Sequence, residues 1–422
     1  MNNIVNNLKK NNIFTDNEYN DISNSIYNTI KCMILDNIEN IMKPDFIDKL
    51  MEEVKEIYYD QLSEIYSDNI DIIKNEIDVI ILNELDNIYR KITPMRSYKK
   101  TFIRKIYNKS DIDTKINYVK NIPQPEQRTP EWYLFRHNLL TASSIWKVFG
   151  TQSSQNQLIY EKCQPFNIEK FNNPSPISLT SPLHWGQKYE PVSVEYYEKL
   201  YNTKVGDFGC IQHEKYKCIG ASPDGIVIDR NSNIYGRMLE IKNIVNRPIT
   251  GIPKIEYWIQ MQLQMETCDL NECDFLETKF VEYNDEAAFN LDGTFQKTDD
   301  DKQKGIMVLF SVNGKPYYEY APINCSKEDY EIWCEKIMEK HENNNWIQNI
   351  YWKLDIVSCV LVQRNKTWFN KVLPKITNIW ETIENERKTG YSHRAAKKRS
   401  RDTNDTNINK NKILVKKDHY NN

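Results

Sequence analysis

The sequence predicts an α/β (α+β) protein whose strands lie in the middle of the chain and whose helices lie at both ends. In residues 1–95, Ile and Leu recur at spacings of three and four, as on one face of an amphipathic helix. Between residues 205 and 322, short runs rich in β-branched and aromatic residues are separated by turn residues, which is typical of strands. Helical spacing returns after Ser326.

Composition places the chain among soluble globular proteins. Of its 422 residues, 40% are hydrophobic and 27% are charged, and no run approaches the roughly 20 apolar residues of a membrane span. The first residues, MNNIVNNLKKNNIF, lack the apolar segment of a signal peptide. The formal charge of −3 argues against non-specific coating of nucleic acid but leaves room for a local basic groove. Nine scattered cysteines form no CxxC pair, so we expect reduced thiols in an intracellular protein.

The chain divides into five parts. Residues 1–95 should form three or four packed helices, with an acidic face that is solvated or docks a partner. Residues 96–127 look like a linker with one short helix, and 128–325 form the core. Residues 326–386 should form two long helices, the first running to about residue 354, and 387–422 a basic, disordered tail. The tail could be a nuclear signal, a DNA-contacting arm or merely solvated. The linker also carries a basic patch of Arg96, Lys99, Lys100, Arg104 and Lys105.

A candidate phosphate site begins the core. Thr129 is a plausible N-cap of a helix with Pro130 in its first turn, and Arg136 lies away from the apolar stripe of that helix. The sequence TASS from Thr141 starts the next helix, and helix starts with nearby arginines bind anions. An ordinary cap beside a surface arginine is the alternative.

A polar, loop-rich stretch over 150–180 precedes a helix from about residue 183 to 202. Trp185, Tyr189 and Val192 share one packed side of that helix. Glu190 lies one residue off this stripe and could be an acidic metal ligand, although spacing alone favours a surface glutamate.

The chemistry is expected between Cys218 and Gln264. Asp224 lies in the turn SPDG, and the strand that follows carries Glu240 and Lys242 on one face, with Ile241 pointing into the core. Two carboxylates and a lysine at a strand edge suit metal-assisted phosphodiester hydrolysis. Taken separately, the strand pair could be a solvated face and SPDG an ordinary turn with glycine at positive φ.

A glutamine-rich helix follows from Ile255 to Glu266. Gln260 and Gln264 lie one turn apart, and Gln262 lies on another face. A glutamine near the metal could bind the scissile phosphate or the attacking water; the alternative is that the glutamines only decorate the surface.

The segments EWYLFRHNLLTASS, WGQKYEPVSVEYY, GASPDGIV, LEIK and YWIQMQLQM occur in one order between Arg128 and about Glu282. Together they resemble the YqaJ-type viral recombinase family, relatives of bacteriophage lambda exonuclease in the PD-(D/E)xK nuclease superfamily. The resemblance implies a restriction-endonuclease-like fold, with a mixed central sheet flanked by helices. The added N-terminal helical region and the tail depart from the minimal phage enzyme, and with the composition they suggest a large DNA virus.

The resemblance also implies roles for individual residues. Asp224, Glu240, Glu190 and the carbonyl of Ile241 would hold Mg²⁺, or Mn²⁺ as an alternative, and Lys242 would position or activate the water. The remaining matches are Gln260 and Gln262 in the family's Gln-x-Gln, Arg136 and Ser143 at the 5′-terminal phosphate, and Glu214 near a further acidic position.

The implied function is a metal-dependent exonuclease that acts on duplex DNA from a 5′ end, in recombination, repair or genome processing. Alternatives are a structure-specific endonuclease on the same fold and a catalytically idle DNA-binding or virion protein. The absent cysteine cluster counts against an iron–sulfur nuclease. Expected partners are DNA, a single-strand annealing protein or another viral replication protein, and further copies of the chain, with no membrane. The expected location is the host cytoplasm or a viral replication site, and packaging in the virion stays open.

Overall fold

A computed structural model describes residues 13–66, 70–99, 108–167, 178–179 and 181–396. Within these residues a seven-stranded sheet has the order β2-β5-β6-β7-β10-β8-β9, and a small sheet has the order β1-β4-β3. The large sheet is mixed, because β6 and β7 are parallel and the other pairs are antiparallel. The strands are β1 (Leu140–Thr141), β2 (Val205–Gly206), β3 (Ile211–Gln212), β4 (Ile219–Ala221), β5 (Gly225–Val227), β6 (Met238–Asn243), β7 (Glu272–Glu282), β8 (Lys304–Val312), β9 (Lys315–Tyr320) and β10 (Asn345–Gln363).

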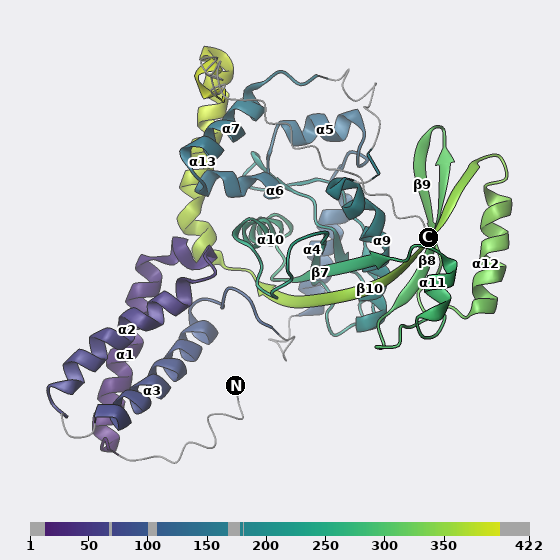
Figure 1. Ribbon diagram of the computed structural model, residues 1–422. Coiled ribbons are helices and arrows are strands. Elements are labelled where there is room, and N and C mark those ends of the chain that lie inside the picture. The colour runs from purple at the N-terminus through teal and green to yellow at the C-terminus, as the bar shows by residue number, and fades with distance from the viewer. Residues whose placement is uncertain (1–12, 67–69, 100–107, 168–177, 180, 397–422) are drawn as a thin grey trace, which may run out of the picture.

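Helices flank this sheet and extend beyond it at both ends (Figure 1). The predicted mixed sheet with flanking helices is therefore confirmed. The α-helices are α1 (Asp16–Asp36), α2 (Phe46–Ser63), α3 (Ile70–Lys91), α4 (Lys109–Asn121), α5 (Pro130–His137), α6 (Ala142–Ile145), α7 (Gln152–Cys163), α9 (Pro182–Tyr201), α10 (Ile255–Cys268), α11 (Glu286–Leu291), α12 (Lys327–Lys340) and α13 (Lys366–Thr389). The 3₁₀ turns are η2 (Ile38–Met42), η4 (Trp146–Phe149) and η5 (Ser392–Arg394).

Strand β6 fixes which helix covers which face of the sheet, because its side chains alternate. Ile241 is buried in a cluster with Tyr197 of α9, so α9 covers that face. Glu240 points the other way and accepts a hydrogen bond from Gln264 of α10, which covers the opposite face. The predicted alternation of Glu240 and Ile241 is thus confirmed.

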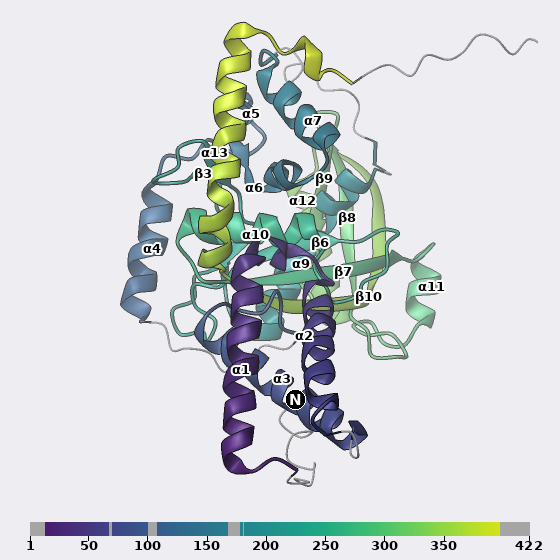
Figure 2. The same ribbon diagram turned by 90° about the vertical axis from the view of Figure 1, so that its left-hand side faces the viewer.

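The N-terminal helices pack as a bundle beside the sheet domain (Figure 2). Their isoleucines at helical spacing, such as Ile26, Ile30 and Ile77, are buried as the periodicity predicts. Arg96 joins the bundle to the domain, since its guanidinium donates to the carbonyls of Met42 and Pro253. Arg96 is therefore buried and is not part of a surface basic patch, and Lys100, Arg104 and Lys105 lie outside the described residues.

The long helix predicted from Ser326 to about residue 354 is wrong in its second half. Helix α12 ends at Lys340, and the 19-residue strand β10 follows. β10 pairs with β7 along one edge and with β8 along the other, so it lies inside the sheet. The spacing of its aromatic residues imitated a helix, but its run of β-branched and aromatic residues is better accommodated between two strands.

Two other segments are more regular than expected. Residues 152–163, within the predicted polar loop, form α7, which Thr151 caps and which buries Leu158, Ile159 and Cys163. Helix α13 continues to Thr389. Arg394 then pairs with Glu386 and donates to Asn156 of α7 at 2.6 Å, so the beginning of the predicted disordered tail packs on the domain. The rest of that tail lies outside the described residues.

In the part of the chain that the structure covers, none of the helices combines the length and the apolar character needed to span a bilayer.

Candidate nuclease active site

Asp224 lies where strand β5 separates from β6. The two strands pair only at Gly225↔Leu239 and Ile226↔Met238, so the edge of β6 is open beyond Leu239. Asp224 Oδ2 fills this gap and accepts a hydrogen bond from the backbone N–H of Ile241 at 2.7 Å. The strand geometry thus places the turn aspartate at the edge of the strand that carries the second acid.

Glycine is required after Asp224 for a reason that the sequence did not reveal. The backbone angle φ of Gly225 is not positive, so the turn does not use the left-handed region at this residue. A Cβ atom on Gly225 would instead lie 2.2 Å from Cγ1 of Val205, on the neighbouring strand β2. Glycine therefore permits the close approach of β2 to β5.

Glu240 and Lys242 project together from β6, as predicted, and form an ion pair. Glu240 is fully buried, and its other oxygen, Oε2, accepts a hydrogen bond of 2.7 Å from Gln264 Nε2. The same amide group also donates to the carbonyl of Ser222 at 3.2 Å, just before Asp224. Gln264 thus links the two acidic segments.

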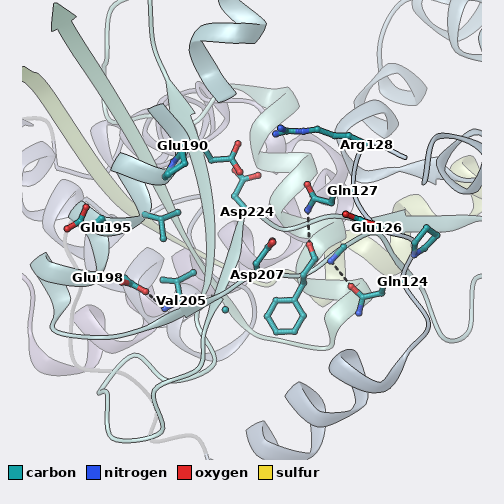
Figure 3. A pocket seen from close by; sticks show the side chains of 16 residues that line it. Gln124, Glu126, Gln127, Arg128, Glu190, Glu195, Glu198, Val205, Asp207 and Asp224 are labelled. Carbon is teal, nitrogen blue, oxygen red and sulfur yellow. Dashed lines mark hydrogen bonds between the residues drawn. The ribbon is translucent and has the colours of Figure 1, made fainter. Parts of the chain in front are cut away.

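A cavity of about 770 Å³ opens beside Asp224. Glu190 of α9 and Asp207, which follows β2, line it together with Asp224, and Arg128 extends over it (Figure 3). Asp207 reaches the site because β2 pairs with β5, where Gly206 is opposite Ile226. Asp207 and Arg128 are site residues that the sequence analysis missed.

The cavity concentrates negative charge. Burial and the nearby charges of Glu240 and Glu190 raise the pKa of Asp224 well above its ordinary value of 3.8, against the opposing effect of Lys242. Burial also raises the pKa of Glu190; Arg128 opposes this shift, and Asp207 adds to it. The carboxylates therefore have too little positive charge around them, which is the condition that a bound cation relieves.

Lys242 keeps its proton in this setting. Burial alone would lower the pKa of its ammonium group, but the charges of Glu240 and Asp224 and the hydrogen bond to Glu240 raise it overall. A protonated ammonium group donates hydrogen bonds and cannot accept a proton. This favours a role in positioning a water or a phosphate oxygen over a role as general base.

The donor set fits a hard divalent cation. Among the described residues, no group of three or more His, Cys, Asp or Glu side chains forms a ready-made metal centre. Mg²⁺ is commonly held by only one or two carboxylates, with water and substrate phosphates completing its coordination. Asp224, Glu240 and Glu190 would supply such oxygen ligands. The excess negative charge around these carboxylates is the electrostatic condition that favours binding of a divalent cation.

Three expected residues are less closely involved. Gln262 is on another side of α10, where its amide bonds the backbone of Gln363 and Asn365, so the structure does not bring it to the carboxylates. Gln260 is half-buried, and Gln264, one turn later, makes the contact with Glu240. Glu214 lines a different cavity with Lys115 and His213, away from Asp224.

Arg136 and Ser143 come together as predicted. Arg136 donates to Ser143 Oγ at 3.3 Å and to Ser222 Oγ at 2.9 Å, so it lies next to the turn that carries Asp224. It also lines a cavity of about 350 Å³ with His137 and Lys162. Burial and the neighbouring cations Arg136 and Arg387 lower the pKa of Lys162 to about 8. Crowded cations of this kind are typical of a site for an anion.

Sequence comparison connects this geometry to a known family. Residues 131–271 match the family described as the YqaJ-like viral recombinase domain. An uncharacterized protein of Acanthamoeba polyphaga mimivirus, a large DNA virus, is 29% identical over 333 residues. That match covers 68% of this chain but only 58% of the mimivirus protein.

Solved structures of exonucleases are similar over a large part of the chain. The alkaline exonuclease LHK-Exo from Laribacter hongkongensis is 18% identical, with a TM-score of 0.36, and the match covers 62% of this chain and 95% of the exonuclease. A phage-related exonuclease from Haemophilus somnus is 13% identical, with a TM-score of 0.33 and coverage of 58% and 94%. Residues 131–271, which contain Asp224, Glu240 and Lys242, are thus similar to the YqaJ-like viral recombinase domain.

Proposed function

We propose that this protein is a metal-dependent deoxyribonuclease that degrades duplex DNA from a 5′ end. The observation that carries the proposal is the meeting of Asp224, Glu240 and Glu190 beside the protonated Lys242. Mg²⁺ is the proposed ion, with Mn²⁺ as a substitute. When bound, such an ion supplies a Lewis acid for the phosphoryl oxygens and lowers the pKa of a coordinated water.

The side chains of the site would have separate roles in this reaction. Asp224 and Glu240 would hold the ion, with Glu190 and the carbonyl of Ile241 as further ligands. The ammonium group of Lys242 would donate to the attacking water or to a phosphate oxygen and offset its developing negative charge. Gln264 fixes one oxygen of Glu240 and so keeps that carboxylate in one orientation.

Preference for a 5′ end is proposed from Arg136 and Ser143. Arg136 lines a cavity together with Lys162 and His137, and Glu161 is the one acidic side chain among the described residues that line it. A terminal phosphate carries more negative charge than an internal phosphodiester, so such a cavity would favour phosphorylated ends. We further propose that the enzyme acts in recombination or repair of a viral genome, with a single-strand annealing protein as a candidate partner.

An end-labelled DNA assay tests the proposal. Linear duplexes with 5′-phosphate or 5′-hydroxyl ends and closed circles are incubated with the protein in Mg²⁺ or in EDTA. We expect Mg²⁺-dependent loss of linear DNA, faster from phosphorylated ends, and intact circles. Arg136→Ala should reduce the preference for the phosphate more than it reduces the rate on 5′-hydroxyl ends.

Other outcomes contradict parts of the proposal. Cutting of closed circles would make the protein an endonuclease. Binding of DNA without cleavage in Mg²⁺ or Mn²⁺ would favour a catalytically idle binding protein.

A further inference from the structure

The loop between β6 and α10, residues 244–254, leads away from the strand that carries the candidate catalytic acid. Arg247 lies in this loop, and its guanidinium forms an ion pair with Glu277 on the adjacent strand β7. The side chain of Arg247 is 22% exposed, whereas that of Glu277 is 1% exposed. A surface-accessible cation is therefore anchored to a buried carboxylate.

Glu277 lies next to the lysine of the site. It is in register with Lys242 across the parallel pair β6–β7, and partners in register point to the same face of a sheet. Its second oxygen, Oε2, is buried and has no hydrogen-bond partner among the described residues. A buried carboxylate is costly unless it is paired, so Arg247 is held firmly by the charge of Glu277.

Tyr257, in the first turn of α10, connects the two cations. The ammonium nitrogen of Lys242 lies 5.1 Å from the centre of its ring, and the guanidinium carbon of Arg247 lies 5.5 Å from the same centre. Both distances are within the range of cation–π contact. Arg247 is thus placed beside the same aromatic ring as the lysine of the active site.

The cavity beside Asp224 is acidic, and a DNA strand cannot approach it without cations near its phosphates. Successive nucleotides of one strand advance by about 3.4 Å along the duplex axis. Lys242 and Arg247 contact the same ring of Tyr257, so they would contact phosphates that are within a few nucleotides of each other on the strand. Arginine has five N–H donors in a planar fork. One terminal nitrogen of Arg247 bonds Glu277 and the other donates to the carbonyl of Pro248 at 3.3 Å, so further N–H groups remain to face a phosphate.

We propose that Arg247 binds a DNA phosphate next to the bond that is cleaved, and that Glu277 and Tyr257 are positioning residues that hold its guanidinium in place. This inference rests on the proposed nuclease function, because it assumes that DNA lies across Lys242. It assigns the loop 244–254 to the substrate-binding surface. The simpler alternative is that Arg247 only neutralises the buried Glu277.

Equilibrium binding of DNA distinguishes phosphate binding by Arg247 from simple neutralisation of Glu277. A fluorescein-labelled duplex is titrated with the protein in EDTA at several salt concentrations, and cleavage is measured separately in Mg²⁺. Loss of one phosphate contact should reduce the slope of log K against log salt by about 1. We expect this change in Arg247→Ala, together with a KM for DNA that is roughly 5- to 30-fold higher.

Matched variants keep the result interpretable. Arg230→Ala is the control, since Arg230 is an exposed arginine on another loop that pairs with the half-buried Asp113. The salt slope and KM of this variant should stay at the wild-type values. Arg247→Ala could unfold the protein by leaving Glu277 unpaired, so the neutral pair Arg247→Met with Glu277→Gln is measured as well. Glu277→Gln alone should keep the salt slope, because the cation remains, but raise KM as Arg247 loses its anchor.

The inference fails if both variants that lack Arg247 fold and keep the wild-type salt slope and KM. Failure of the proposed function has a different signature. In that case the wild-type protein would not cleave DNA in any divalent cation, whatever the binding of the Arg247 variants shows.

Discussion

Replacing Asp224 by Asn should stabilise the metal-free protein while it abolishes cleavage. The amide oxygen of Asn can still accept the hydrogen bond from the backbone N–H of Ile241, so the geometry of the strand edge is kept. The substitution removes one negative charge from a group of carboxylates that raises the pKa of Asp224 well above its ordinary value. The metal-free fold therefore loses a repulsive interaction.

The size of the effect follows from simple electrostatics. Two carboxylates about 5 Å apart at an effective dielectric constant of about 20 repel each other by roughly 3 kcal/mol. Lys242 offsets part of this, so we expect Asp224→Asn to gain about 1–2 kcal/mol in EDTA. In wild-type protein, Mg²⁺ at 100 times its dissociation constant should add about 2.7 kcal/mol, which the variant should lose. The order of stability should therefore reverse between EDTA and saturating Mg²⁺.

Urea denaturation in EDTA and in Mg²⁺, with the cleavage assay alongside, tests this reversal. The pH gives an internal control, because a carboxyl group whose folded-state pKa is raised stabilises less as the pH rises from its unfolded-state value towards the raised one. The advantage of the variant in EDTA should thus shrink when the pH falls towards 3.8, the ordinary value. A variant that is less stable than wild type in EDTA, or that Mg²⁺ still stabilises fully, would refute the reasoning.

Three further predictions concern other parts of the structure. Gln264→Met should lower kcat roughly 10- to 100-fold, which is the equivalent of a lost hydrogen bond to a charged group. The matched variant Gln262→Met should leave kcat unchanged and lower the urea midpoint, because the side chain of Gln262 bonds backbone groups. Burial raises the pKa of Glu272 to about 7. Between pH 4.5 and 7, the free energy of unfolding of wild type should therefore fall by about 3 kcal/mol relative to that of Glu272→Gln. Urea titrations at several pH values measure this, and a difference between the two proteins that does not change with pH would contradict it. Gly305→Ala should cost at least about 2 kcal/mol in the same denaturation assay, because its Cβ would lie 2.2 Å from the ring of Trp352 on β10; a neutral effect would argue against the pairing of β8 with β10.

The proximity of candidate residues that are close in the chain could be predicted from the sequence. Asp224 and Glu240 are close in the chain, and a hairpin with alternating side chains is enough to bring them together. Arg136 and Ser143 are seven residues apart, and a helix followed by a second helix start places them in contact. Such short-range geometry follows directly from strand and helix periods.

Features that depend on distant pairing could not be predicted in this way. Asp207 enters the site because β2 pairs with β5, and nothing in its own neighbourhood in the sequence marks it. The strand β10 depends on two partner strands far away in the chain, and its aromatic spacing resembled a helix. The glutamine that contacts Glu240 was a different case. Helix geometry already placed Gln264 and Gln262 on different faces of α10, but the resemblance to the family pointed to Gln260 and Gln262.

The most direct test of a divalent ion at Asp224 is anomalous diffraction from crystals of this protein soaked in Mn²⁺. We predict a peak about 2.1–2.2 Å from carboxylate oxygens of both Asp224 and Glu240, and no such peak in crystals of Asp224→Asn. A peak elsewhere, or none beside these two acids in crystals of protein that cleaves DNA, would contradict the assignment of the site.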